Sequence, residues 1–319
     1  MESVLQRIGS IGILPGATVL KPGEAIPLGK ALLEGNLPAL ELRFNETTDE
    51  VLRSLVSELP ELAAGALVRT ASEAKRAVEA GAKFISTAAF NPEVVNTCLA
   101  LEAEVLPGAG SPRDIEESLA LGVPVTRFFP SECSRGADVL STFADAWPEM
   151  RFIPAGGVTP ENASRYLSLR NVLAIRAGWI AERHLIESEH FEEIVRRADE
   201  ALLAIHNFGL LHIGINNERE EDAVTAARKL SFLFGFRLRE RPNSMFADPG
   251  FELMKTPDLG KNGHVAIGVN DIPRALTYLR QKGVSPIAGT ERYQDDGSLR
   301  RVYLDLEISG FAFHLRSYK

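Results

Sequence analysis

The chain has 319 residues, 45% of them hydrophobic and 24% charged, which is ordinary for a soluble globular protein and indicates about two domains. Its formal net charge of −8 argues against nucleic acid as the main partner, and its two cysteines form neither a disulfide framework nor a zinc ribbon. Neither a signal peptide nor an apolar run of about 18 residues is evident, so we expect a cytoplasmic protein that makes no membrane contact.

After a short helix over residues 1–8, the first 206 residues alternate apolar runs with helical patterns. The runs predict eight strands, at residues 11–20, 39–44, 66–69, 83–86, 104–106, 123–129, 151–154 and 172–175. Helices are expected at 24–34, 72–81, 92–100, 112–121, 160–167 and 191–205. Short apolar strands separated by helices predict an α/β fold, a (β/α)8 TIM barrel over residues 1–206. A doubly wound open sheet is the alternative, but no glycine-rich dinucleotide fingerprint is present.

Beyond the first domain the pattern changes, and an internal repeat is visible. LHIGIN at 211–216 is echoed by GHVAIGVN at 263–270, and each run precedes an amphipathic helix. The closing strands, GFELMK at 250–255 and GFAFHL at 310–315, are also alike. These runs predict two βαβββ units in a smaller α+β domain over residues 207–319. Neither unit can bury its sheet alone, so we expect the two to pair into one curved sheet.

In a barrel of this kind the active site lies at the carboxyl ends of the strands. The candidate residues at these ends are Glu41, Arg43, Gly108, Arg127, Gly156, Gly157 and Arg176. A Gly-Gly turn before a helix offers free backbone N–H groups to an anion, and the guanidinium of Arg176 would strengthen such a site. One interpretation is therefore a pocket for a phosphorylated or carboxylated small molecule. The other is that Glu41 and Arg127 pair with each other and plug the mouth of the barrel.

Several segments within residues 5–205 together carry a family resemblance: LLEGNLPALELRF, VEAGAKFI, FNPEVV, LPG, RFFPSE, RFIPAGGVTPENASRYL and AGWIA. They resemble the 2-keto-3-deoxy-6-phosphogluconate (KDPG) and 4-hydroxy-2-oxoglutarate (KHG) aldolases. The resemblance implies a class I aldolase, in which a lysine forms a Schiff base with a 2-keto acid and a glutamate moves protons. It also implies a homotrimer and no cofactor in the barrel.

Matched position by position, the family's glutamate falls on Glu41, but its Schiff-base lysine falls on Arg127. An arginine is no amine nucleophile, because its charge is delocalised and its pKa stays above about 12. Other family positions around the pocket also differ, at Asn45, Leu67, Ala88, Ala155, Arg176 and Gly178. We therefore predict a barrel that binds an anionic 2-keto acid or phosphorylated sugar acid and has lost Schiff-base activity. The alternative is an active aldolase that uses another base, with Lys21 as the candidate amine.

The motifs HIGIN, GKNGHVAIG and GFAFHL resemble the vicinal-oxygen-chelate (glyoxalase-like) superfamily over residues 208–319. The resemblance implies a divalent metal bound by His and Glu from the first and last strands of each repeat. Those places hold His212, Glu252, His264 and His314, a donor set that suits zinc, nickel or iron. A metal-dependent activity in this domain is thus a third hypothesis. The alternative is that the histidines hydrogen-bond internally within the sheet.

Overall fold

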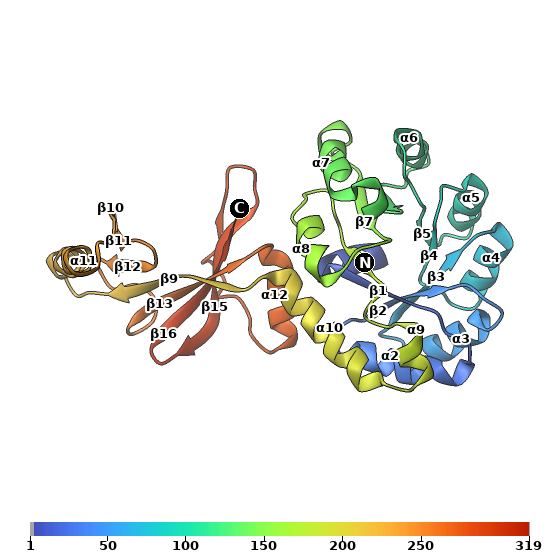
Figure 1. The fold of residues 1–319 in the computed structure, drawn as a ribbon, viewed down its shortest axis with the longest axis horizontal. Coiled ribbons are helices and arrows are strands. Elements are labelled where there is room, and N and C mark those ends of the chain that lie inside the picture. Colours follow the sequence, from blue (N-terminus) through green and yellow to red (C-terminus); the bar gives the residue numbers. More distant parts are fainter. Residues whose placement is uncertain (1–2, 319) are drawn as a thin grey trace. The chain divides into compact units, whose positions relative to one another are not determined.

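The computed structural model describes residues 3–318, which form two compact units divided between Ile205 and His206. Among these residues, no helix combines the length and the apolar composition needed to cross a bilayer. The first unit alternates strands with helices, and Figure 1 shows its helices arranged around the strands.

The strands of the first unit are β1 (Ile13–Ala17), β2 (Ala39–Arg43), β3 (Ala63–Val68), β4 (Phe84–Thr87), β5 (Glu104–Leu106), β6 (Val125–Phe128), β7 (Arg151–Pro154) and β8 (Ile175–Ala177). Its helices are α1 (Val4–Ile11), α2 (Ala25–Glu34), α3 (Thr48–Glu58), α4 (Ala71–Glu79), α5 (Pro92–Ala100), α6 (Pro112–Ala120), α7 (Gly136–Ala146), α8 (Pro160–Leu167), α9 (Arg183–Glu187) and α10 (Phe191–His206), with short 3-10 turns η1 (Pro22–Glu24) and η2 (Glu132–Ser134).

All strand pairs of the first unit are parallel. Six strands form a curled sheet in the order β5-β4-β3-β2-β1-β8, and β6 pairs with β7. Isolated parallel bridges link Gly108 to Arg127 and Phe152 to Val172, between the two groups of strands. The α/β class and the parallel sheet that the sequence predicts are thereby confirmed.

One end of this curled sheet is closed by apolar side chains. Leu5 and Ile8 of α1 pack with residues that stand mostly near the amino ends of the strands, including Leu14, Phe84 and Ile153. These side chains are almost completely buried. Because the amino ends are filled in this way, the opposite, carboxyl ends are left to carry the polar residues of a site.

The strand predictions at 104–106 and 151–154 match the structure, whereas the eighth prediction, 172–175, lies too early. The eighth strand is Ile175–Ala177, and Val172 instead makes the isolated bridge to Phe152. The first strand is shorter than predicted, because Ile11 ends α1. Three helices, α3, α7 and α9, were not predicted.

The second unit is built on one eight-stranded sheet. Its elements are β9 (Gly209–Asn216), α11 (Glu220–Phe234), β10 (Leu238–Glu240), β11 (Ser244–Ala247), β12 (Phe251–Met254), β13 (Gly263–Val269), α12 (Ile272–Gln281), β14 (Arg292–Tyr293), β15 (Leu299–Ile308) and β16 (Phe311–Ser317). The strand order is β10-β11-β12-β9-β13-β16-β15-β14, with β9 and β13 antiparallel at the centre. Each half is a βαβββ unit with the same internal order, as the repeat predicts.

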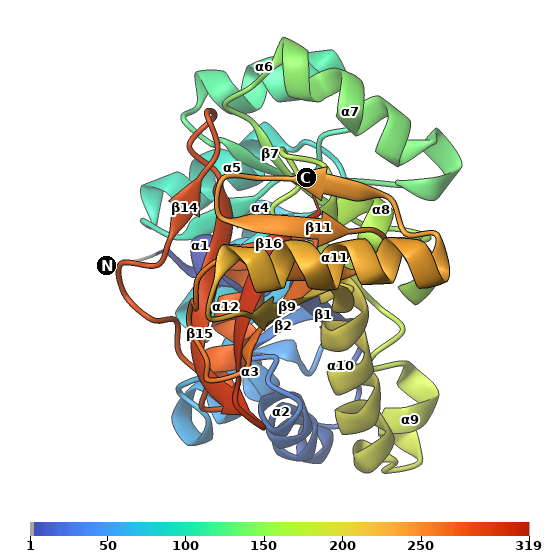
Figure 2. The same ribbon diagram turned by 90° about the vertical axis from the view of Figure 1, so that its left-hand side faces the viewer.

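Both helices of the second unit cover the same side of its sheet. Ala223 and Ala227 of α11 pack on Met245 and Leu253, and Figure 2 shows α11 lying along β11. Helix α12 packs in the same way on β13, β15 and β16. Because side chains alternate along a strand, every second residue of these strands faces away from the helices. The open face of the sheet is where the predicted metal ligands lie.

Candidate functional site

The polar centre of the first unit is the carboxylate of Glu41 on β2, which is fully buried. Its Oε1 accepts hydrogen bonds from Arg127 Nη1 at 2.5 Å and from Ser86 Oγ at 2.7 Å. Its Oε2 accepts a hydrogen bond from Arg176 Nε at 3.1 Å. Three strands besides β2 thus contribute one donor each to a single carboxylate.

The two arginines determine the protonation state of this carboxylate. Burial by itself raises the pKa of Glu41, but the charges of Arg127 and Arg176 and the hydrogen bonds from Arg127 and Ser86 lower it to about 2. Glu41 is therefore ionised at neutral pH. A carboxylate held this way by two cations is a poor proton acceptor, because protonation would break both ion pairs.

Residues on the neighbouring strands leave space for the two guanidinium groups beside Glu41. Gly16 lies beside Glu41 in the register of β1 and β2. A Cβ at Gly16 would lie 2.0 Å from Nη2 of Arg176, so a larger residue would displace the guanidinium. Arg127 is 4% exposed, and its guanidinium carbon lies 5.7 Å from the centre of the Phe129 ring. Its Nε is buried without a hydrogen-bond partner among the described residues.

The remaining predicted residues lie around this centre at different depths. Arg43 is exposed and lines a cleft of about 400 Å³ together with Arg176. Gly108 forms the bridge to Arg127, and its N–H donates to Thr87 Oγ1 at 3.0 Å.

The Gly-Gly turn after β7 lies beside a different carboxylate, that of Glu132. Both Gly156 and Gly157 have a φ of +84°. They lie against Phe129 and Glu132, and the carboxylate of Glu132 accepts a hydrogen bond from the Tyr166 hydroxyl. The structure therefore brings Glu41, Arg127 and Arg176 into contact, while the glycine turn is next to a carboxylate of its own.

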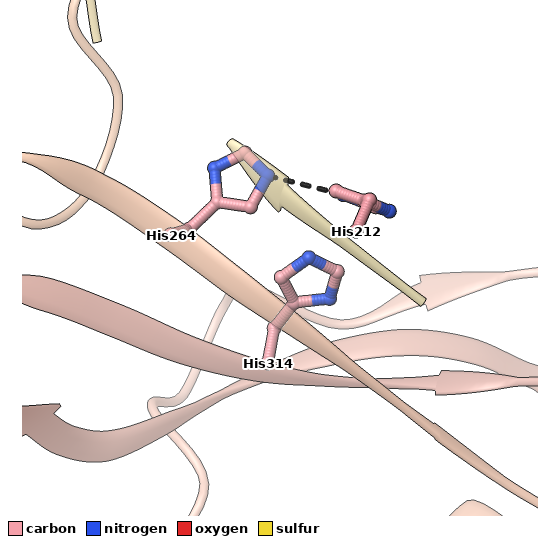
Figure 3. Close-up of side chains that lie close together, drawn as sticks. All are labelled: His212, His264 and His314. Atoms are coloured by element: carbon pink, nitrogen blue, oxygen red, sulfur yellow. Dashed lines mark hydrogen bonds between the residues drawn. The ribbon is translucent and has the colours of Figure 1, made fainter. Parts of the chain in front are cut away.

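In the second unit, the four predicted metal ligands lie on the open face of the sheet. Strand register places them together: Glu252 and His264 both lie opposite Gly214, and His212 and His314 both lie opposite Ala266. Figure 3 shows the three imidazole rings gathered over neighbouring strands. A Cβ at Gly214 would lie 2.1 Å from the ring of His264, so this glycine is what lets the ring lie over the sheet.

Three donor atoms of this cluster converge. His212 Nε2 lies 3.0 Å from Glu252 Oε2 and 3.2 Å from His264 Nε2, and His264 Nε2 lies 3.4 Å from Glu252 Oε2. A tetrahedral ion with bonds of about 2.0–2.1 Å holds its ligand atoms about 3.3 Å apart. Ligand atoms of all three histidines lie within 4.8 Å of one another.

The electrostatics of the cluster also suit metal ligands. Burial, followed by the charges of His264 and His212, lowers the pKa of His314 to about 3, so this ring is neutral at physiological pH. Both of its nitrogens are buried without a hydrogen-bond partner among residues 3–318. Burial alone would raise the pKa of Glu252, but hydrogen bonds from His212, His264 and Ser244 lower it.

Residues 4–197 match the family described as KDPG and KHG aldolase. The 2-dehydro-3-deoxy-phosphogluconate aldolase of Treponema pallidum is 29% identical over 204 residues, which cover 63% of this chain and 97% of that protein. The corresponding aldolase of Pseudomonas aeruginosa is 31% identical, covering 60% and 87%. A crystal structure of the Zymomonas mobilis KDPG aldolase with 3-phosphoglycerate shares 26% identity at a TM-score of 0.58 and covers 63% and 96%.

The chain belongs to the KDPG and KHG aldolase family. Its fold in this region is the α/β aldolase fold with a curled parallel sheet. The family match ends at residue 197, so the second unit, a sheet-rich fold of two βαβββ halves, lies outside it.

The lysines of the first unit lie at its surface, away from the buried carboxylate of Glu41. Residues 3–205 contain four lysines, and all of them are exposed: Lys21, Lys30, Lys75 and Lys83. None lines either of the two clefts that Arg43 lines.

Sequence reasoning missed one residue of the buried centre. Ser86 is fully buried and donates to Glu41, and its signal is a serine directly after apolar Phe84 and Ile85 in a predicted strand. That position was assigned to the strand, but the pairing of β4 with β3 and the contact with Glu41 are not readable from local pattern.

Proposed function

We propose that the first unit is an aldolase-family barrel that binds an anionic 2-keto acid or phosphorylated sugar acid and has no Schiff-base lyase activity. The observation that carries the proposal is the buried ion pair between Arg127 and Glu41, with Arg127 where the resemblance places the lysine. Arginine stays protonated and its charge is delocalised, so it does not attack a carbonyl. Closure of the eight strands into a complete (β/α)8 barrel is part of the proposal, supported by the bridges at Arg127 and Val172.

Charge at the mouth supports an anionic ligand. Arg127 and Arg176 share one carboxylate, so one positive charge is left over, and Arg43 adds another beside the same cleft. Positive charges close together in a partly buried site repel unless an anion joins them. The relative from Zymomonas mobilis was crystallised with 3-phosphoglycerate, a small phosphorylated acid.

The alternative is an active KDPG/KHG aldolase that uses another amine. Lys21 is exposed, and only its place after β1 favours it as that amine. A Schiff-base lysine is activated in a desolvated pocket or beside another cation. The exposed side chain of Lys21 does not lie in a desolvated pocket.

Reductive trapping with pyruvate and borohydride separates these two possibilities. We expect no adduct on the full-length protein by intact mass, while the Escherichia coli KHG/KDPG aldolase serves as a positive control. Arg127→Lys puts an amine beside Glu41, and we expect this variant to be trapped. An adduct on the wild-type chain, mapped to any lysine, would overturn the proposal.

The second unit has a second candidate function, a divalent-metal centre formed by His212, Glu252, His264 and His314. The observation that favours it is the triangle of donor atoms at 3.0–3.4 Å, with two further buried nitrogens on His314 that lack partners in the described residues. The two paired βαβββ halves support the vicinal-oxygen-chelate identity that the sequence resemblance implies. A divalent ion bound there would supply Lewis-acid polarisation of an oxygen ligand.

Metal content tests this second candidate directly. Full-length protein purified without a histidine tag is analysed by plasma mass spectrometry, and about one equivalent of zinc, nickel or iron is expected. His264→Ala should lose the metal, whereas His190→Ala, an exposed histidine of the first unit, should keep it. Less than about a tenth of an equivalent after reconstitution with each ion would contradict the proposal.

A further inference from the structure

A second group of charged side chains surrounds the histidine cluster. Together with His212, Glu252 and His314, five arginines line a cleft of about 380 Å³: Arg241, Arg292, Arg300, Arg301 and Arg316. Glu252 is the one acidic residue among the described residues that line it, and its oxygens already bond Ser244 and the histidines. The cleft is therefore strongly positive in a chain whose net charge is −8.

Strand register places three of these arginines in one row. Arg316 on β16 lies opposite Arg301 on β15, and Arg301 lies opposite Arg292 on β14. Residues directly opposite each other share a face of the sheet, with Cβ atoms about 5 Å apart, and like charges in such pairs repel. This arrangement costs stability unless an anion lies between the guanidinium groups.

No ion pair within residues 3–318 neutralises the row. Within residues 3–318, none of the five arginines has an ion pair with Asp or Glu, whereas neighbouring Arg239 binds both oxygens of Asp248, at 2.7 and 2.9 Å. The Nε of Arg301 is buried without a hydrogen-bond partner in the same range. The guanidinium groups of Arg241 and Arg301 lie 4.6 and 5.3 Å from the centres of aromatic rings, which hold them in place.

We propose that this cleft binds a small polyanion, an acid with at least two acidic groups, such as a dicarboxylate or a phosphorylated carboxylic acid. The arginine row binds one group through paired charge-assisted hydrogen bonds, the geometry in which guanidinium groups bind carboxylates and phosphates. Arg316 and His314 are two residues apart on β16, or about 7 Å, so a short acid spans from the row to the histidines. The part that reaches the histidines rests on the metal centre proposed above; the arginine row does not.

A small ligand fits these observations better than a nucleic acid or an acidic protein. The arginines converge on a concave cleft whose volume lies in the range of ligand pockets, instead of spreading along a convex surface. The chain as a whole is acidic, which disfavours a long polyanion.

Calorimetric titration of the full-length protein at constant ionic strength tests the inference. The probes are 2-oxoglutarate, citrate and 3-phosphoglycerate, with acetate as the monoanion control. We expect at least one of the three to bind more than about tenfold more tightly than acetate. Arg301→Gln and Arg316→Gln should each weaken that binding by about ten- to a hundredfold, as expected for the loss of a charge-assisted hydrogen bond.

Two controls locate the binding. Arg239→Gln makes the same substitution in the neighbouring arginine that Asp248 already neutralises, and binding should be unchanged. Arg176→Gln removes a barrel arginine, so affinity that survives in this variant and is lost in Arg301→Gln belongs to the second unit. Circular dichroism and thermal melting of each variant confirm folding.

The outcomes distinguish this inference from the metal centre. Binding that depends on Arg301 and Arg316 in a protein that takes up no metal on reconstitution supports the arginine row and overturns the metal centre. A protein that holds metal but binds no probe more tightly than acetate overturns the inference. Equal losses in Arg239→Gln and Arg301→Gln, or a short single-stranded RNA that displaces the acids at lower concentration, would also overturn it.

Discussion

In the first unit, buried Arg127 and partly buried Arg176 share a partner from their own chain, since both donate to Glu41. In the second unit, Arg301 and Arg316 lie opposite each other on neighbouring strands and have no ion pair within the described residues. Both units bring like charges together, but only the first brings the compensating charge as well. The charges of the first arrangement are therefore balanced within the folded chain, whereas the second arrangement is complete only with a ligand.

The largest expected effect is on the stability of the first unit, whose Arg127 and Arg176 are paired with Glu41. Arg127→Gln leaves Glu41 buried with only Arg176 as its cation, and breaking a buried ion pair on one side costs about 3–5 kcal/mol of unfolding free energy. Both tryptophans, Trp147 and Trp179, belong to the first unit, so their fluorescence during urea unfolding follows this unit alone. Arg127→Lys keeps a positive charge and should lose less. A loss below about 1 kcal/mol would show that the pair does not stabilise the unit.

In the second unit, a bound metal ion should raise the unfolding free energy. A zinc concentration one hundred times the dissociation constant adds about 2.7 kcal/mol to its unfolding free energy, because the ion binds the folded state alone. Differential scanning calorimetry of full-length protein, stripped with a chelator and reloaded, should move the transition of the second unit and leave that of the first in place. His264→Ala should abolish the shift. Movement of both transitions together would contradict the assignment.

The Glu41 pair also predicts a pH dependence. The pKa of Glu41 is lowered to about 2 in the folded state, so its contribution to stability is fully present above the ordinary pKa of 4.5 and is lost as the pH falls toward 2. In that window, unfolding free energy should fall more steeply for the wild type than for Glu41→Gln, by up to about 1.4 kcal/mol per pH unit. Parallel slopes in tryptophan-monitored unfolding would mean that Glu41 is not an ion pair.

The smallest effect has the opposite sign. Arg301→Gln removes one charge from an uncompensated row, so in ligand-free protein it should raise the unfolding free energy of the second unit by about 0.2–1 kcal/mol. Arg239→Gln breaks an ion pair with Asp248 and should lower it slightly or leave it unchanged. If Arg301→Gln destabilises the ligand-free unit, the row has an intramolecular role and the contrast between the two units fails.

The sequence predicted those parts of the fold that depend on local pattern. The strand at 151–154 is a short apolar run that begins directly after a proline-containing loop, and the βαβββ repeat is visible because both copies keep similar strands. Helix α9 is only five residues long, too short for a periodic pattern. Helix α3 does carry apolar Val51, Leu52 and Leu55 at helical spacing, so its signal was present.

The candidate site was predictable residue by residue, but its contacts were not. Sequence pattern selected Glu41, Arg127 and Arg176, and it left open whether Glu41 and Arg127 pair; in the structure they do. The row of Arg301 and Arg316 was missed because it depends on the register of β15 against β16. That register shifts between Leu304 and Glu307, and such an irregularity has no local signature.

The proposed function of the first unit requires that an arginine has replaced its Schiff-base amine. The most direct measurement is the rate of pyruvate release from 2-keto-3-deoxy-6-phosphogluconate by the full-length protein, Arg127→Lys and the Escherichia coli relative under one set of conditions. We predict that the wild type does not exceed the uncatalysed rate and that Arg127→Lys does. A wild-type rate comparable to that of the Escherichia coli enzyme would contradict the account.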